Sequence, residues 1–299
     1  MKTLYVSDLD GTLLNRQAQL TPRSEEIIRR LIDSGMLFTV ATARSQSAIQ
    51  YLQQLGVRIP SVHLNGVLLY DYSRRQYIDC VPMDTDTSLA VIRILKAFDR
   101  MSFVYKFDSD CGINVEFERL SNEVERRFFE VRKNSDYKSF RQTSEITVSD
   151  DDKVIYFTMV DTHERLLPIY TAIQQLPQAK ATLYSDNYSS LYFLEVFSSS
   201  ATKAAGVLKL KQLLGADRVV VFGDNLNDLE MMHISDCGIA VGDAVEAVRQ
   251  QATQIIAPSY QDGVALYLEG VALRGSAPAP RWGNPFSSEK SIQPPPEIR

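Results

Sequence analysis

Apolar residues near the N-terminus alternate between short continuous runs and runs with helical spacing. Residues 3–8 (TLYVSD) and 36–42 (MLFTVAT) are short and rich in β-branched or aromatic side chains, which is typical of buried strands. Residues 22–35 between them have apolar positions three and four apart, with Thr21 as the predicted N-cap and a glycine at the end. This order predicts two parallel strands joined by a helix.

The same alternation continues and then returns late in the chain. A helix is predicted at residues 45–56, with Ser45 as N-cap, and a third short strand of the same sheet at 61–66 (SVHLNG). The late elements are a helix at 201–215, a strand at 218–224, a helix at 227–235, a strand at 237–242 and a helix at 243–252. Repeated strand–helix units of this kind predict a doubly wound α/β fold with a parallel sheet.

The middle of the chain lacks this regular order. Aromatic and β-branched runs at 153–160 and 191–197 predict strands, and residues 162–176 between them have a helical pattern. We therefore expect an α/β core formed by residues 1–82 and 198–275, with an inserted α+β domain at 83–197. The remaining residues 276–299 are rich in Pro and Ser, and we expect them to be disordered.

The composition of the chain indicates which kind of molecule it binds. The 299 residues are 44% hydrophobic and 23% charged, with a formal net charge of -5. A slightly acidic chain has no electrostatic reason to bind nucleic acid or an anionic membrane, so a small molecule is the expected partner. No apolar run has the length of a transmembrane helix or the form of a signal peptide, which predicts a cytoplasmic protein. The sequence does not indicate an oligomeric state.

Four short segments with polar residues fall at strand ends of the predicted core sheet. These residues are Asp8, Asp10, Thr42, Lys203, Asp224 and Asp228. Each one alone fits an ordinary turn, an N-cap or a solvated charge. Ligands of parallel sheets bind at the carboxyl ends of the strands, and carboxylates beside a hydroxyl and an ammonium group suit Mg²⁺ and a phosphoryl group. The set therefore predicts a phosphate site with a magnesium ion.

The stretches DLDGTLL at Asp8, VATAR at Thr42, the lysine Lys203 and GDNLND at Asp224 resemble the four motifs of the haloacid dehalogenase (HAD) superfamily. The pair NG at Asn65 resembles the Cof-type phosphatase branch of that superfamily. The resemblance implies a HAD-like Rossmannoid core, and the position of the long insertion after Thr42 implies a cap domain of the C2B kind. The cap would read the leaving group of the substrate.

The resemblance also implies roles for particular residues. Asp8 would be the nucleophile that forms an aspartyl phosphate, and Asp10 the general acid and base. Magnesium would be held by Asp8, Asp224 and the backbone carbonyl of Asp10, with support from Asp228. The phosphate oxygens would be bound by Thr42, Lys203, Asn227 and the backbone N–H groups of Leu9 and Asp10, while Asn65 is a candidate for the substrate pocket.

The implied function is that of a Mg²⁺-dependent phosphatase for sugar phosphates or related small phosphomonoesters. A phosphotransferase or phosphomutase with the same scaffold, and a non-catalytic binding protein, remain open as alternatives. Polar and aromatic residues of the insertion are candidates for substrate recognition, namely Asp108, Asp110, Tyr184, Asp186 and Tyr188. A solvated strand edge explains these five residues equally well.

Overall fold

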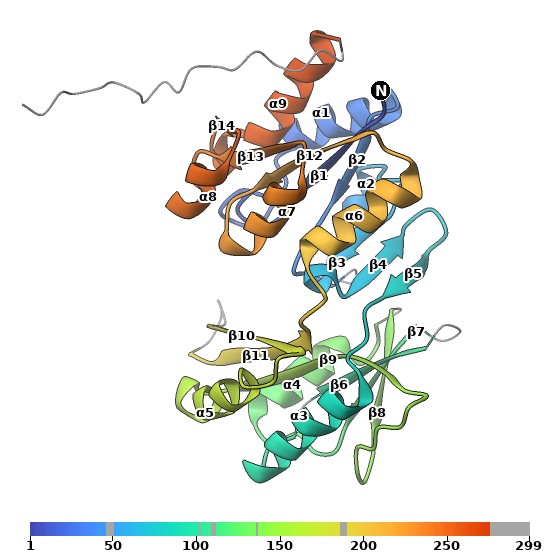
Figure 1. Cartoon of the computed structure of the whole chain (residues 1–299), viewed down its shortest axis with the longest axis vertical. Coiled ribbons are helices and arrows are strands. Elements are labelled where there is room, and N and C mark those ends of the chain that lie inside the picture. The colour runs from blue at the N-terminus through green and yellow to red at the C-terminus, as the bar shows by residue number, and fades with distance from the viewer. Residues whose placement is uncertain (46–50, 102, 109–111, 136, 186–189, 276–299) are drawn as a thin grey trace, which may run out of the picture.

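The computed structural model describes residues 1–45, 51–101, 103–108, 112–135, 137–185 and 190–275, and the chain forms two lobes (Figure 1). Two segments connect the lobes, one between β5 and α3 and one between β11 and α6. The predicted tail 276–299 and the first turn of the helix predicted at 45–56 lie outside the described residues.

The first lobe is built on a five-stranded parallel sheet. In spatial order its strands are β14 (Gln254–Ile256), β13 (Cys237–Val241), β12 (Arg218–Gly223), β1 (Thr3–Ser7) and β2 (Leu37–Val40). The chain moves outward from β1 to β2 on one side and from β12 to β13 on the other. Because crossovers are right-handed, these opposite directions put the connecting helices on opposite faces of the sheet. The fold is therefore the predicted doubly wound α/β core.

One of the two predicted capping residues is confirmed among the helices of this lobe. These helices are α1 (Pro22–Asp33), α2 (Tyr51–Gln54), α6 (Lys203–Leu214), α7 (Leu229–Ile234), α8 (Glu246–Gln251) and α9 (Gly263–Leu273). The Thr21 side chain accepts a hydrogen bond from the backbone N–H of Ser24, as an N-cap does. Within the described residues no helix is both long and apolar enough to cross a membrane.

The third predicted strand differs from expectation. Residues Ser61–His63 form β3, which pairs antiparallel with β4 (Leu68–Asp71), and β4 pairs with β5 (Gln76–Cys80). Among the described residues, one isolated parallel bridge, from Ala41 to Val62, connects β3 to the main sheet. The strand ends early because the next three residues, Leu64, Asn65 and Gly66, have φ values of 49°, 55° and 105° and turn the chain back.

The second lobe is an α+β unit, as predicted. Its six-stranded sheet has the order β10 (Ala179–Ser185), β11 (Tyr192–Ser198), β9 (Lys153–Asp161), β6 (Phe103–Asp108), β7 (Gly112–Phe117) and β8 (Lys138–Gln142). Its helices are α3 (Thr85–Ala97), α4 (Glu123–Arg132) and α5 (His163–Ile173). All strand pairs are antiparallel except β7 with β8.

One hydrophobic cluster spans both lobes. Leu64, Val67 and Leu68 of the first lobe belong to the same buried cluster as Tyr105 and Tyr156 of the second. Each Å² of apolar surface that this contact removes from water stabilises the packing of the two lobes by roughly 25 cal/mol. The turn at residues 64–66 therefore lies where the two lobes meet.

A buried histidine beside this turn predicts a pH-dependent stability. The His63 side chain is completely buried, and burial lowers the pKa of its imidazole to about 3 from the ordinary value of 6.5. The unfolded chain then binds a proton that the folded chain excludes, so stability present above the unfolded pKa is lost as the pH falls below it. Between pH 7.5 and pH 5.0 we expect His63 to lower the free energy of unfolding by about 2 kcal/mol.

Urea unfolding of the wild type and of His63→Gln at both pH values measures this effect. The variant should lose about 2 kcal/mol less than the wild type over the same interval. An NMR titration in which the His63 imidazole protonates near pH 6.5 would contradict the assignment.

Candidate active site

The site begins at the point where the strand order reverses. β1 and β12 are neighbours in the sheet, and Asp8 and Asp224 follow directly after them. The backbone N–H of Asp8 donates to the Phe222 carbonyl across 2.9 Å, which fixes the first residue beyond β1 against β12. In open α/β sheets, ligands bind at this kind of reversal, outside the carboxyl ends of the strands.

Lys203 connects two buried carboxylates. Its Nζ lies 2.8 Å from Asp8 Oδ1 and 2.8 Å from Asp228 Oδ1. Lys203 is the first residue of α6, directly after the N-cap Thr202, whose side chain accepts from the N–H of Ala205. The exposed fractions of Lys203, Asp8 and Asp228 are 2%, 6% and 0%. A buried charge needs a partner, and here each charge has one.

Asp228 is fully engaged by the protein. Its Oδ2 accepts from the N–H groups of Asp224 (2.9 Å) and Asn225 (3.1 Å), while Oδ1 accepts from Lys203 (2.8 Å). Asp228 is thereby part of a capping box at a short 3₁₀ helix, Leu226–Asp228. This carboxylate positions the loop after β12 and orients Lys203.

Asp8 and Asp224 each keep one oxygen available. Thr12 donates to Asp224 Oδ1 across 2.6 Å, but no donor among the described residues contacts Oδ2 of either carboxylate. Asp8, Asp224 and Asp228 each offer an oxygen within 4.8 Å of the others. Gly11 makes this approach possible, because a Cβ on it would lie 2.4 Å from Asp224 Oδ2, and its φ of +80° favours glycine. An oxygen-only set of this kind fits a hard divalent cation.

The electrostatics of the site reflect crowded negative charge. Burial raises the pKa of Asp8 to about 7, although the Lys203 ammonium acts in the opposite direction. Burial likewise raises the pKa of Asp224 to about 6. Burial disfavours the charge on Lys203, yet the two adjacent carboxylates outweigh it and raise its pKa above the usual range. A bound cation would favour the ionised form of both acids.

Asp10 faces away from this cluster and toward a cavity. Arg44 binds it through both oxygens, with Nε 2.7 Å from Oδ2 and a terminal nitrogen 2.5 Å from Oδ1. Thr42, two residues before Arg44, is almost completely buried, and its hydroxyl accepts from the Arg44 N–H across 3.1 Å. The Thr42 carbonyl accepts from the N–H of Asn65. The segment after β2 therefore holds both Asp10 and the turn at 64–66.

Asn65 and Asn227 meet at the edge of the same cavity. Asn227 donates its amide N–H to Asn65 Oδ1 across 3.3 Å. The turn that carries Asn65 lies directly against the start of α6, because a Cβ on Gly66 would be 2.1 Å from the Thr202 carbonyl oxygen. Leu9, between Asp8 and Asp10 in the sequence, has a completely buried side chain.

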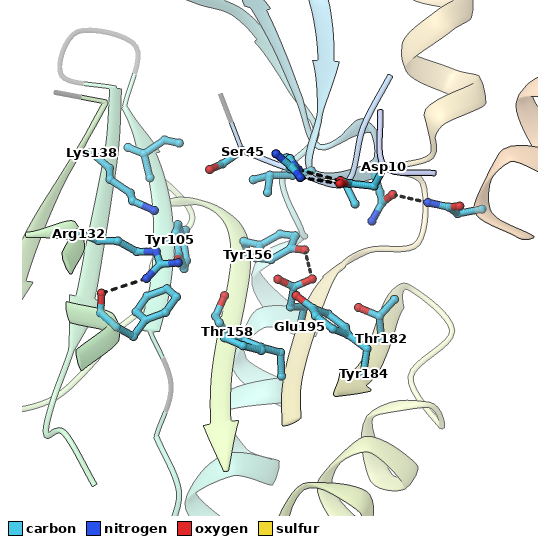
Figure 2. Close-up of a pocket in the computed structure, with 18 of the residues that line it drawn as sticks. Asp10, Ser45, Tyr105, Arg132, Lys138, Tyr156, Thr158, Thr182, Tyr184 and Glu195 are labelled. Carbon is cyan, nitrogen blue, oxygen red and sulfur yellow. Dashed lines mark hydrogen bonds and ion pairs between the residues drawn. The ribbon is translucent and has the colours of Figure 1, made fainter. Parts of the chain in front are cut away.

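A cavity of about 620 Å³ lies between the two lobes (Figure 2). The first lobe contributes Asp10, Ala43, Arg44, Ser45, Leu64, Asn65, Asn225 and Asn227. The second lobe contributes Tyr105, Ile113, Phe128, Arg132, Lys138, Tyr156, Thr158, Thr182, Tyr184, Phe193 and Glu195. A ligand here would contact charged, aromatic and hydroxyl groups together, as is usual for small-molecule sites.

The five residues predicted as candidates for substrate recognition lie in different parts of the structure. Tyr184 lines this cavity. Asp108 lines a different cavity, of about 530 Å³, within the second lobe. Asp110, Asp186 and Tyr188 lie outside the described residues.

Thr12 and Arg44, which bind Asp224 and Asp10, had no predicted role, and neither had most residues that the second lobe contributes to the cavity. Thr12 and Arg44 both lie inside the motif-like stretches DLDGTLL and VATAR. Arg44 is two residues after Thr42, but only the folded chain shows that its guanidinium reaches Asp10. The position of both residues in these stretches could have indicated a role, but the sequence does not show which residues they bind.

Comparisons with known proteins found similar sequences that span most of this chain. A family model described as haloacid dehalogenase-like hydrolase matches residues 5–268. The 5-amino-6-(5-phospho-D-ribitylamino)uracil phosphatase YitU of Bacillus subtilis is 26% identical over 278 residues, which cover 89% of this chain and 96% of the relative. The pyridoxal phosphate phosphatase YbhA of Escherichia coli is 25% identical over 266 residues, covering 87% and 95%.

Solved structures have the same fold. A haloacid dehalogenase-like hydrolase from Bacteroides thetaiotaomicron superimposes with a TM-score of 0.69 at 22% identity, covering 91% of this chain and 100% of the other. A HAD subclass IIB sugar phosphatase gives a TM-score of 0.66 at 20% identity, with the same coverage. The parallel-sheet core with an additional sheet-and-helix cap is thus a known architecture.

Proposed function

This chain belongs to the family of haloacid dehalogenase-like hydrolases and is a phosphatase, and we propose that it hydrolyses phosphomonoesters of small metabolites with Mg²⁺ as cofactor. The observation that carries the proposal is the buried Asp8–Lys203–Asp228 group beside Asp224 at the reversal of the sheet. An adjacent cavity of about 620 Å³ has room for a phosphorylated metabolite.

Asp8 is the proposed nucleophile. Its Oδ1 is held by Lys203, and no described donor contacts its Oδ2, so this oxygen can attack phosphorus and form an aspartyl phosphate. Lys203, Thr42, Asn227 and the N–H groups that follow Asp8, beginning with that of Leu9, would bind the non-bridging phosphate oxygens. Stabilising charge on those oxygens is the main task in phosphoryl transfer.

Asp8, Asp224 and the backbone carbonyl of Asp10 would hold the magnesium ion, and Asp228 would support them. When bound, the ion supplies positive charge that offsets the crowded carboxylates and the phosphate. Asp228 has both oxygens occupied by Lys203 and by backbone N–H groups, which suits a supporting role better than direct coordination.

Asp10 is the proposed acid and base. It lines the cavity, where the leaving group would lie, and Arg44 holds its carboxylate through two hydrogen bonds. Asp10 would protonate the leaving oxygen and then remove a proton from the water that attacks the aspartyl phosphate. Residues 83–197 would act as the cap, covering the site and reading the leaving group together with Asn65.

Release of inorganic phosphate from a panel of substrates tests the proposal. The panel contains sugar phosphates, pyridoxal phosphate and 5-amino-6-(5-phospho-D-ribitylamino)uracil, because the relatives YbhA and YitU are named for the last two. We expect hydrolysis with Mg²⁺ and none after chelation with EDTA. Hydrolysis that persists unchanged in EDTA would contradict the cofactor.

The role of Asp10 predicts a difference between leaving groups. Asp10→Asn should lower kcat/KM for a sugar phosphate by about 10²–10⁴-fold, since its alkoxide needs a proton. In a single turnover, formation of the aspartyl phosphate from p-nitrophenyl phosphate should be much less affected, because p-nitrophenolate leaves without one. Equal losses with both substrates in the single-turnover measurement would contradict the acid role.

A further inference from the structure

We propose that Arg132 and Lys138 form a subsite for a second anionic group, so that the preferred substrates are phosphomonoesters whose leaving group carries a carboxylate or another phosphate. This inference rests on the proposed function, because it assigns the far end of the cavity that Asp10 lines. It concerns the recognition of the leaving group and not the chemical step.

The two cations lie close together in the second lobe. Arg132 is the last residue of α4 and Lys138 the first of β8, and both line the cavity. Figure 2 shows their side chains grouped with Tyr105 at one end, while Tyr156 and Glu195 lie between this end and Asp10. A substrate with its phosphate beyond Asp10 would therefore extend its leaving group toward the two cations.

Lys138 is surrounded by aromatic rings. Its Nζ lies 5.4 Å from the ring centre of Tyr105 and 5.7 Å from that of Phe140, and no carboxylate of the described residues is within ion-pair distance. Burial and the nearby Arg132 guanidinium lower the pKa of Lys138 to about 8. Arg132 itself stacks on Phe128, 4.0 Å from the ring centre. Two adjacent cations in a partly covered cavity are stabilised by an anion between them.

The opposite face of the same sheet provides a contrast. Lys106, next to Tyr105 on β6, points to the other face, as successive strand residues do, and pairs with Glu116 and Asp152 at 3.1 Å each. Arg141 of β8 is paired with Glu116 as well. The sheet thus neutralises its cations on one face and leaves Lys138 without a described acidic partner on the cavity face.

The acids of the cavity do not cancel this charge. Among its described lining residues the acids are Asp10 and Glu195. Arg44 already binds Asp10, and the Tyr156 hydroxyl donates to Glu195 across 2.8 Å. Burial also raises the pKa of Glu195, which favours its neutral form. Among the described residues of this wall, Lys138 therefore has no acidic partner, and an anionic leaving group would be complementary to it.

Matched substrates test the subsite. 6-Phosphogluconate and glucitol 6-phosphate have the same carbon chain but differ in a carboxylate at the far end. Glucose 1,6-bisphosphate and glucose 6-phosphate form the corresponding phosphate pair. We expect the wild type to prefer the doubly anionic member of at least one pair by about tenfold or more in kcat/KM, and the pair with the larger ratio identifies the group.

Variants assign the preference to the two residues. In Lys138→Met and Arg132→Gln the ratio should fall by about ten- to a hundredfold, and Lys138→Arg should keep most of it. The matched control is Lys153→Met, since Lys153 also lies over an aromatic ring, 5.9 Å from the centre of Phe107, but lines the other cavity. This control should leave the ratio unchanged.

A wild-type ratio near one in both pairs, or an equal ratio in wild type and Lys138→Met, would overturn the subsite while leaving the phosphatase intact. If no phosphomonoester is hydrolysed at all, the proposed function fails, and calorimetry then decides on the subsite. In that measurement 6-phosphogluconate should bind about tenfold more weakly to Lys138→Met than to the unmodified chain. Equal binding would overturn the subsite on its own.

Discussion

Replacing Asp8 by asparagine is expected to lower kcat by about four orders of magnitude or more, because the variant lacks the carboxylate proposed as the nucleophile. The side chain keeps its size and its place beside Lys203. Burial raises the pKa of the Asp8 carboxyl to about 7, so its charge is destabilised in the folded chain above that pH. A neutral amide removes this cost, and at pH 8 in metal-free buffer we expect the free energy of unfolding to be retained or increased.

Steady-state kinetics and urea unfolding measure the two effects separately. Asp33→Asn is the matched control, since Asp33 is an exposed carboxylate at the end of α1 that pairs with Arg58 across 3.2 Å. It should change neither quantity measurably. An Asp8→Asn enzyme with one hundredth of wild-type activity or more would exclude Asp8 as the nucleophile.

Replacing Lys203 by methionine is expected to destabilise the fold as well as to abolish activity. The substitution leaves Asp8 and Asp228 buried without the cation that lies 2.8 Å from each. Loss of one partner in a buried ion pair costs about 3–5 kcal/mol, because the remaining charge has no compensation. The loss should be smaller at low pH, where protonation removes the negative charge that has lost its partner.

The same helix offers a control. Lys209 of α6 is largely exposed and pairs with Asp79 of β5 at 2.5 Å. Lys209→Met should cost less than about 1 kcal/mol, as exposed ion pairs usually do. If Lys203→Met and Lys209→Met lower the free energy of unfolding equally, the buried cluster does not hold the core together in the way described.

The parallel core was predictable because its strands and helices carry strong local patterns. Strands buried on both faces read as continuous apolar runs, and the helix after Thr21 has both a capping residue and a proline at its first position. The strand β14 and the helix α9 were not predicted. β14 has only three residues, and α9 is apolar on most of its surface, so neither has a clear period.

The error at β3 has a local cause that the sequence does contain. Residues 61–66 are apolar enough for a strand, but the backbone turns at Leu64 and Asn65 with positive φ. Asparagine and glycine favour that conformation, whereas leucine does not, and Leu64 adopts it with its N–H bonded to the Arg44 carbonyl. Tertiary contact therefore overrides local preference at this position.

That the four polar segments lie close together was predictable, because the strand ends of a parallel sheet lie at one edge. The cavity wall contributed by the second lobe was not predictable. Arg132 and Lys138 look like ordinary surface charges in the sequence, and only the pairing of β8 with β7 brings Lys138 to the cavity. The pairings that place Thr12 against Asp224 and Lys203 against Asp8 likewise span about two hundred residues.

The pairing of β1 with β12 also limits how early the core can fold during synthesis of the chain. Thr3 pairs with Arg218 and Ser7 with Phe222. More than two hundred further residues must therefore be synthesised before β12 is available to pair with β1. The six-stranded sheet draws all of its strands from residues 103–198, and those contacts can form earlier in translation. The long loop that β1 and β12 must close makes the central sheet a late and slow event. The buried charges around Lys203 consequently cannot come together before β12 and the loop after it have been synthesised.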